Sequence, residues 1–320
     1  LSSQGDFTTT FDLKGFPLSV LSEQIRPLLD LDPTSGSFDL SVTHKRHKGE
    51  EQGEATFLFS DLRPGSAQAD TALPLALLAN NQDQMQVLIP LSTKSDTPLF
   101  KQTVALFQTQ IVKAGVAPLL LAGAEFADLQ ERQFITFPEG LSELDVLGDN
   151  DVHETLQHFA DLLAERPHLG LVLNGMADPT HDRAVIQKAL EEKERKRIAL
   201  KNEQRLEEWQ KKEQIKEQTL KAQQAAAPPG KIIERNIPAQ DGPPAPLQPE
   251  PVTVSETTLQ DLAQERALQV YDFYATLPGI ASGRITLQDK TRISEAESPG
   301  NRVLIELKPV FQNIHNIEMP

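Results

Sequence analysis

Histidine and aspartate side chains gather between residues 149 and 182, and these residue types can bind zinc or carry acid–base chemistry. The histidines are His153, His158, His168 and His181, and the aspartates are Asp149, Asp151, Asp178 and Asp182. His153 and His158 are five residues apart, whereas two metal ligands on one helix face are usually four apart. The spacing predicts no metal site, and no residue pattern indicates a cofactor.

The short motifs typical of hydrolases and nucleotide-binding enzymes are missing from the sequence. It has no Gly-x-Ser-x-Gly and no Walker-type loop. It also has no Cys, which excludes disulfides, thiolate metal sites and cysteine nucleophiles but fixes no compartment. Its 46 acidic residues are too many for one catalytic pair to be chosen by type alone. We therefore expect a protein that is not an enzyme.

The composition indicates folded parts joined to polar parts. A length of 320 residues suits two domains, and 38% hydrophobic residues is low for a compact globule. The net charge of −15 would repel a phosphate backbone, and no stripe of Lys and Arg with interleaved aromatic residues is present. Nucleic acid is therefore excluded as the expected partner.

Residues 1–97 have the alternation of apolar and polar residues that is typical of strands with one buried face. The clearest examples are residues 7–13 and 37–43, and residues 55–59 and 85–91 alternate less strictly. Helical spacing interrupts this pattern at residues 17–31 and 73–79. The pattern predicts an antiparallel β region with short helices.

The most apolar stretch, residues 98–130, begins with helical spacing and is broken by Gly115 and Pro118. A membrane span needs about 20 largely apolar residues, and Lys101 and Lys113 disfavour one here. An amphipathic helix that covers the end of the β region is the better interpretation, with core packing as its ordinary role. If the helix also contacts lipid, the candidate residues are Leu99, Phe100, Leu106, Phe107, Ile111 and Leu119.

The second half of the chain is predicted to be an α/β domain that a long insertion divides. Residues 131–179 contain a strand, a helix and a second strand, and strands joined in this way should run parallel. Residues 180–254 predict an exposed helix rich in Glu and Lys, followed by a Pro-rich linker that is extended or disordered. Residues 255–310 return with a helix and strands, and residues 311–320 form a tail.

Several segments in these two halves resemble the OmpA-like domain, whose elements follow the order β-α-β-α-β-β. They are Phe137, the turn Gly175-Met-Ala-Asp178, the helix Leu262-Ala-Gln-Glu-Arg-Ala-Leu-Gln-Val270, and Gly279-Ile-Ala-Ser-Gly-Arg-Ile285. The resemblance implies a two-layer α/β sandwich. The whole chain is thus expected to be an α+β protein.

Other segments resemble the C-terminal region of AsmA-like envelope proteins. They include Ser60-Asp-Leu-Arg-Pro-Gly65, Ala72-Leu-Pro-Leu-Ala-Leu-Leu-Ala79 and Met85-Gln-Val-Leu-Ile-Pro-Leu-Ser92. This resemblance implies a periplasmic protein that a segment upstream of this chain anchors to the inner membrane. It also implies a role in outer-membrane biogenesis or phospholipid transport between membranes, with residues 1–97 at the end of a lipid groove. Lipid or a membrane surface, or an envelope protein bound by the insertion, would then be the partner.

The OmpA-like resemblance also implies an alternative, in which the chain binds peptidoglycan. Members of that family hold the diaminopimelate group with an Asp and an Arg, which correspond here to Asp178 and Arg266. The family's Asn is replaced by Leu259 and a Gly by His181, and neither replacement suits the ligand. The competing interpretation is structural, with Asp178 capping a turn and Arg266 pairing with it.

Overall fold

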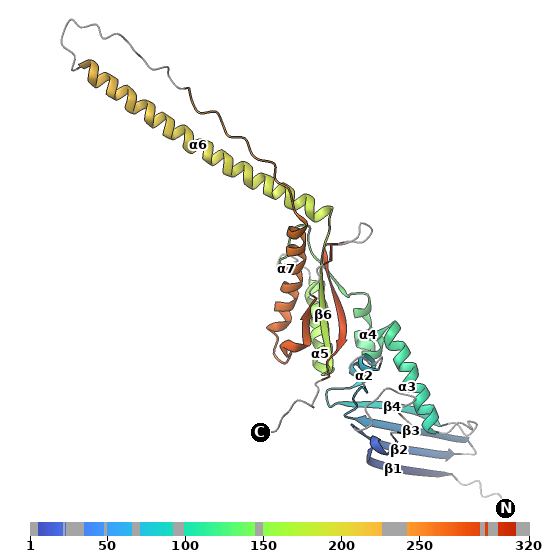
Figure 1. Cartoon of the computed structure of the whole chain (residues 1–320). Helices are drawn as coiled ribbons and strands as arrows, with labels where there is room; N and C mark the ends of the chain where they lie inside the picture. The colour runs from blue at the N-terminus through green and yellow to red at the C-terminus, as the bar shows by residue number, and fades with distance from the viewer. Residues whose placement is uncertain are drawn as a thin grey trace, which may run out of the picture.

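The computed structural model describes residues 6–21, 23, 35–47, 50–65, 71–91, 99–144, 150–225, 242–288, 292–293 and 300–311. One sheet lies at the N-terminal end of the molecule, a second sheet with its helices lies in the middle, and a long helix projects from the far end (Figure 1). This mixed arrangement of helices and two sheets confirms the α+β class.

The first sheet is antiparallel and follows chain order. Its strands are β1 (Phe7–Pro17), β2 (Ser37–His47), β3 (Glu50–Ser60) and β4 (Gln84–Leu91). Their alternation places apolar side chains on one face, where they form a core with the short helices η1 (Leu18–Leu21) and α2 (Ala72–Leu78). Most of the predicted helix at residues 17–31 lies outside the described residues.

The second sheet has the strand order β5-β9-β6-β7, from β5 (Phe134–Thr136), β9 (Arg302–Pro309), β6 (Leu169–Ala177) and β7 (Ile285–Leu287). A further short strand, β8 (Arg292–Ile293), pairs with β6. The core beside this sheet is completed by side chains of α5 (Asn150–Glu165) and α7 (Glu256–Ala275). β5 and β6 run in the same direction, as predicted, but β9 lies between them and is antiparallel to both.

Three short elements connect the two sheets: α3 (Leu99–Val116), α4 (Pro118–Ala122) and η2 (Ala124–Gln130). Buried side chains of α4 and η2, such as Leu119 and Phe126, belong to the same core as Leu156 and Phe159 of α5. Leu77 of α2 joins this core as well. None of the described helices is long and apolar enough to cross a membrane.

A polar joint ties the first sheet to the beginning of β6. Asp83, in the turn before β4, accepts a hydrogen bond from Arg63 at 2.7 Å and lies 2.7 Å from Nε2 of His168. The His168 ring stacks on Phe311 with 4.7 Å between centroids. Phe311 therefore packs against the body of the protein, although it was predicted to begin the tail; residues 312–320 lie outside the described residues.

Acid should weaken this joint. Burial raises the pKa of Asp83, but the hydrogen bond from Arg63 and the contact with His168 outweigh burial, so the pKa lies below its ordinary value of 3.8. Such a carboxylate contributes stability that is present above the ordinary pKa and is lost as pH falls through the lowered one. Urea unfolding at a series of pH values below about 3.8 measures this loss. As the pH is lowered, the free energy of unfolding should decrease less for Asp83→Asn than for the unchanged protein, because the variant has no carboxylate to protonate at this position. An equal dependence of the free energy of unfolding on pH in both proteins would contradict this role of Asp83.

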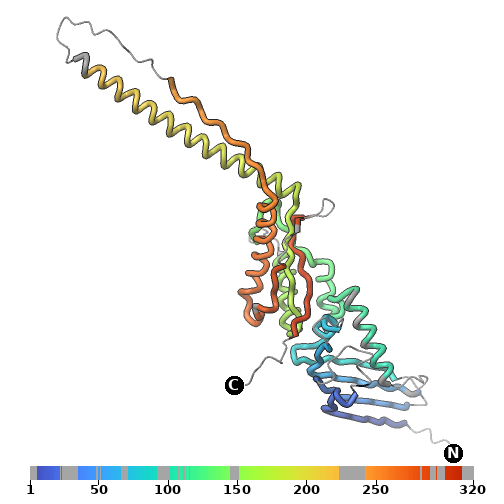
Figure 2. Tube along the Cα trace, viewed as in Figure 1, coloured from blue at the N-terminus to red at the C-terminus, as the bar shows by residue number. Residues whose placement is uncertain are grey.

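The predicted insertion forms a long projection, which we call the arm and whose described parts are residues 181–225 and 242–254. Helix α6 (His181–Ala225) has 45 residues and spans roughly 68 Å at 1.5 Å per residue. Residues 242–254, which we call the strap, return along α6 in an extended conformation (Figure 2). The described part of the Pro-rich linker is thus packed on a helix rather than disordered.

Polar side chains of α6 hold the strap. Asn202 donates to the Leu247 carbonyl at 3.0 Å and accepts from the Leu247 N–H at 2.8 Å. Arg205 donates to the Ala245 carbonyl, and Arg183 donates to the Val254 carbonyl. A proline has no backbone N–H but keeps its carbonyl, so the Pro-rich strap has more hydrogen-bond acceptors than donors. Donor side chains on α6 match these carbonyls. The described strap is therefore an extended segment whose carbonyls are bound by side chains of α6.

Replacing Asn202 with Ala should loosen the strap without unfolding the body. The amide of Leu247 would lose its acceptor, and its hydrogen exchange should become faster. The melting temperature should change little, because Asn202 lies outside the buried core clusters. Gln204→Ala, at an exposed position two residues along α6, is the matched control and should leave Leu247 exchange unchanged. Equal exchange in both variants would show that Asn202 does not hold the strap.

Candidate functional site

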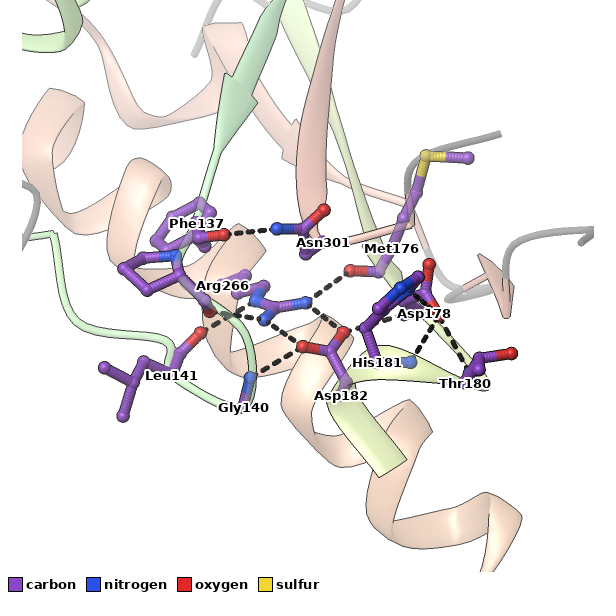
Figure 3. A network of polar contacts seen from close by, with 11 residues as sticks. Phe137, Gly140, Leu141, Met176, Asp178, Thr180, His181, Asp182, Arg266 and Asn301 are labelled. Atoms are coloured by element: carbon purple, nitrogen blue, oxygen red, sulfur yellow. Dashed lines mark hydrogen bonds and ion pairs between the residues drawn. The ribbon is translucent and has the colours of Figure 1, made fainter. Parts of the chain in front are cut away.

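Arg266 of α7 is fully buried, and protein acceptors take all five of its N–H groups (Figure 3). It donates to both oxygens of Asp182, each at 2.8 Å. It also donates to the carbonyls of Leu141 at 2.8 Å, Met176 at 3.1 Å and Pro138 at 3.1 Å. One side chain thus joins the loop after β5, the end of β6 and the beginning of α6.

Asp182, in the first turn of α6, is the carboxylate partner of Arg266 and is also fully buried. Its oxygens accept further hydrogen bonds from the backbone N–H groups of Gly140 and Asp178, each at 2.7 Å. Burial raises the pKa of Asp182, but the hydrogen bonds from Arg266 and the two amides together lower it below the ordinary value. The pair is ionised and internally satisfied, which is the condition under which a buried charge is tolerated.

Asp178 does not pair with Arg266. Its Oδ1 accepts the N–H groups of Thr180 and His181, each at 2.8 Å, and so caps the beginning of α6. The expected capping role agrees with this geometry, whereas the expected ion pair between Asp178 and Arg266 is wrong, because Asp182 occupies the guanidinium. A ligand would reach Arg266 only after the loop that carries Pro138 and Leu141 had moved away.

A second arginine from the OmpA-like motifs also serves the fold. Arg284, in η4 (Ser282–Arg284), donates to the carbonyls of Leu163, Arg166 and Leu169 at 2.7, 2.6 and 2.8 Å. The Leu163 carbonyl belongs to the last turn of α5 and Arg166 follows the helix directly, so the guanidinium lies at the C-terminus of α5, where a positive charge interacts favourably with the helix dipole. Burial lowers the pKa of Arg284. Its donors fix the junction of α5, β6 and β7.

The apolar face of the first sheet is the other candidate surface. Helices α2 and α3 contact β4, and Phe38 and Phe57 in the middle of the sheet are buried. The exposed side chains of β1 show where this cover ends, since Phe11 is 54% exposed and Phe7 is 42% exposed. The face is therefore closed over β3 and β4 and open at β1.

The residues predicted to contact lipid lie on α3 and α4. The side chains of Leu99, Phe100, Phe107 and Ile111 lie outside the described part of the structure. Leu106 is half-buried against the core of the first sheet, and Leu119 is fully buried, so Leu119 is not accessible to lipid here. Among the described side chains of this region, the exposed apolar ones are instead Val112, Val116 and Leu120, which were not predicted as lipid contacts.

The clustered histidines lie apart and have separate neighbours. His153 packs edge-on against Phe273, His158 lies 3.6 Å from Asp128, and His181 lies 3.3 Å from Asp178. Among the described residues, no three His, Asp or Glu side chains come together as metal ligands. These histidines are close in the sequence but do not form one site in the described structure.

Comparison with protein-family models, with curated protein sequences and with solved structures finds no match to this chain. The AsmA-like and OmpA-like resemblances therefore rest on the residues that carry them.

Proposed function

We propose that this chain is a non-enzymatic envelope module of the AsmA-like type, whose first sheet presents an apolar face to lipid acyl chains. The observation that carries the proposal is the open part of that face, where Phe7 and Phe11 are 42% and 54% exposed. Fully burying one such side chain is worth roughly 1.5–3 kcal/mol, and about half of that remains for a side chain that is already half-buried, so a few contacts suffice for reversible binding of an acyl chain.

The element order of the second half supports the OmpA-like part of the proposal. With α6 and the strap set aside, the chain runs β5, α5, β6, α7, β7, β9, which is the family's β-α-β-α-β-β order with the short β8 added. Segments before and after the arm join in one sheet, because β9 pairs with both β5 and β6. The arm thus enters a single small domain as an insertion.

The proposed location is the periplasm, with attachment to the inner membrane through a segment upstream of this chain. In that setting the open face would belong to a path for phospholipid between the membranes, or to outer-membrane biogenesis more broadly. The arm would be available to an envelope partner, since its helix is largely exposed. Peptidoglycan binding gains no support from Arg266, whose donors are all used within the protein.

Titration of the protein with a fluorescent phospholipid tests the proposal. Phe11→Asp should weaken binding about tenfold, or about 1.4 kcal/mol, because it removes an apolar contact and places a charge against the acyl chain. Thr43→Asp adds the same charge to the other face of the sheet, on β2, and should bind as the unchanged protein does. Equal binding by both variants would contradict a lipid role for this face. Binding to purified peptidoglycan that is lost in Asp178→Ala would favour the alternative.

A further inference from the structure

Strand β1 is a long edge strand in which the usual protection is confined to the last residues: Lys14, a register shift between Leu13 and Phe16, and Pro17. It pairs with β2 on one side, and no described strand pairs with its other side. Natural edge strands are kept short or carry Pro, Lys or a bulge. Residues 7–13 have none of these, whereas the opposite edge, β4, carries Pro90, and β5 is three residues long. Among the described strands, residues 7–13 of β1 therefore form the edge best suited to accept another strand.

The hydrogen bond from Asp61 N–H to the Asp83 carbonyl fixes which groups of β1 point outward. This bond continues the register of β3 and β4, in which hydrogen-bonded pairs alternate with non-hydrogen-bonded pairs. Odd-numbered residues of β3 therefore bond to β4, and even-numbered residues bond to β2. Counting through the β2–β3 and β1–β2 registers, the odd-numbered residues of β1 bond to β2. The backbone groups of Thr8, Thr10 and Asp12 therefore face the free edge.

We propose that β1 pairs antiparallel with β1 of a second copy of this chain, centred on Thr10. This register pairs the three outward residues with one another: Thr10 faces Thr10 of the copy, and Thr8 faces Asp12. Threonine opposite threonine is a favourable cross-strand pair, and a threonine hydroxyl can donate a hydrogen bond to a carboxylate. On the apolar face, Phe7 then lies opposite Leu13, and Phe11 opposite Thr9.

The strand sequence selects this centre among those that the outward groups permit. Centring on Asp12 would place two carboxylates directly opposite each other, which is destabilising. Centring on Thr8 would leave Leu13 without a partner among the described residues of β1. The Thr10 centre alone uses all of residues 7–13, so the strand complements itself, as a two-fold symmetric interface requires.

Space outside β1 also permits the pairing. β1 lies at the extremity of the described molecule, away from the second sheet and from the arm (Figure 1). The two sheets would join into one, and their open apolar faces would become continuous. This inference does not depend on lipid binding, because edge pairing uses backbone groups and leaves the apolar face open.

Sedimentation equilibrium of the full chain tests the pairing. We expect a mass of twice 35.4 kDa that falls to 35.4 kDa on dilution. Thr10→Lys places two like charges at the symmetry centre and should give the mass of one chain where the unchanged protein is a dimer. Thr43→Lys is the matched control, because Thr43 is the partner of Thr10 on β2, one strand further in. A single-chain mass for the unchanged protein, or a dimer unaffected by Thr10→Lys, would overturn the proposal.

Single cysteines test the register, since the chain has no Cys of its own. In a hydrogen-bonded antiparallel pair the Cα atoms are about 5.5 Å apart, which a disulfide can bridge. Under mild oxidation Thr10→Cys should form a covalent dimer, and Thr8→Cys alone should not. A mixture of Thr8→Cys and Asp12→Cys should form the mixed dimer. Cross-linking of Thr8→Cys to itself, with none at Thr10→Cys, would overturn this register.

Discussion

Replacing Arg266 with Met is expected to destabilise the protein by roughly 3–5 kcal/mol, the cost typical of removing one partner of a buried ion pair. The variant leaves the buried carboxylate of Asp182 without its cation. It also removes the donors to the carbonyls of Leu141, Met176 and Pro138, which join three separate segments. Urea unfolding of the full chain measures the loss.

Two controls separate the ion pair from general effects of losing an arginine. Arg183→Met changes an arginine next to Asp182 that donates to the backbone carbonyls of Pro179 and Val254, and it should cost about 1 kcal/mol. The double variant Asp182→Leu with Arg266→Met removes both charges and should recover part of the loss. A cost for Arg266→Met no larger than that for Arg183→Met would contradict the assignment.

Replacing Gly175 with Ala should cost about 3 kcal/mol, at the upper end of what overpacking usually costs. A Cβ at Gly175 in β6 would lie 1.9 Å from the carbonyl oxygen of Ala263 in α7. That oxygen is backbone, so α7 would have to move away from the sheet as a unit. The glycine of the motif Gly175-Met-Ala-Asp178 is thus explained by the close packing of α7 on β6.

Gly283→Ala is the matched control for this substitution. A Cβ at Gly283 meets nothing within 4 Å, so its effect should stay within about 0.5 kcal/mol. Thermal unfolding of both variants gives the comparison. If Gly175→Ala melts at the same temperature as Gly283→Ala, α7 does not approach β6 as closely as the structure has it.

Local periodicity predicted much of the fold. Leu259, Leu262 and Val270 stand at helical spacing in the sequence, which places them on one face of α7, and all three are buried. The alternation of strands β1 to β4 likewise predicted which face of the first sheet meets the helices. Such patterns succeed because one element's own spacing decides which side chains share a face.

Features that depend on distant segments were predicted less well. The position of β9 between β5 and β6 follows from a long return of the chain that no local pattern contains. In the same way, Asp178 and Asp182 are four residues apart, and only the path of the turn before α6 decides which one reaches Arg266.

The strap is a third example of this limit. Proline content predicted an extended or disordered segment and gave no sign of its binding to α6. Most of the side chains that bind its backbone, such as Arg183, Asn202 and Arg205, are polar. The apolar contact is short, because only Val254 of the strap joins a buried cluster with Ile186 and Leu190 of α6. The sequence signal for this contact is a set of hydrogen-bond donors at helical spacing along α6, together with a later segment that is poor in N–H groups.

Photocrosslinking from position 11 tests the central claim most directly. With p-benzoylphenylalanine in place of Phe11, irradiation of the protein bound to phospholipid vesicles should attach lipid to the chain. The same group in place of Thr10, also exposed but on the opposite face of β1, should attach little. Lipid attached equally at positions 10 and 11, or at neither, would contradict a lipid-binding face on the first sheet.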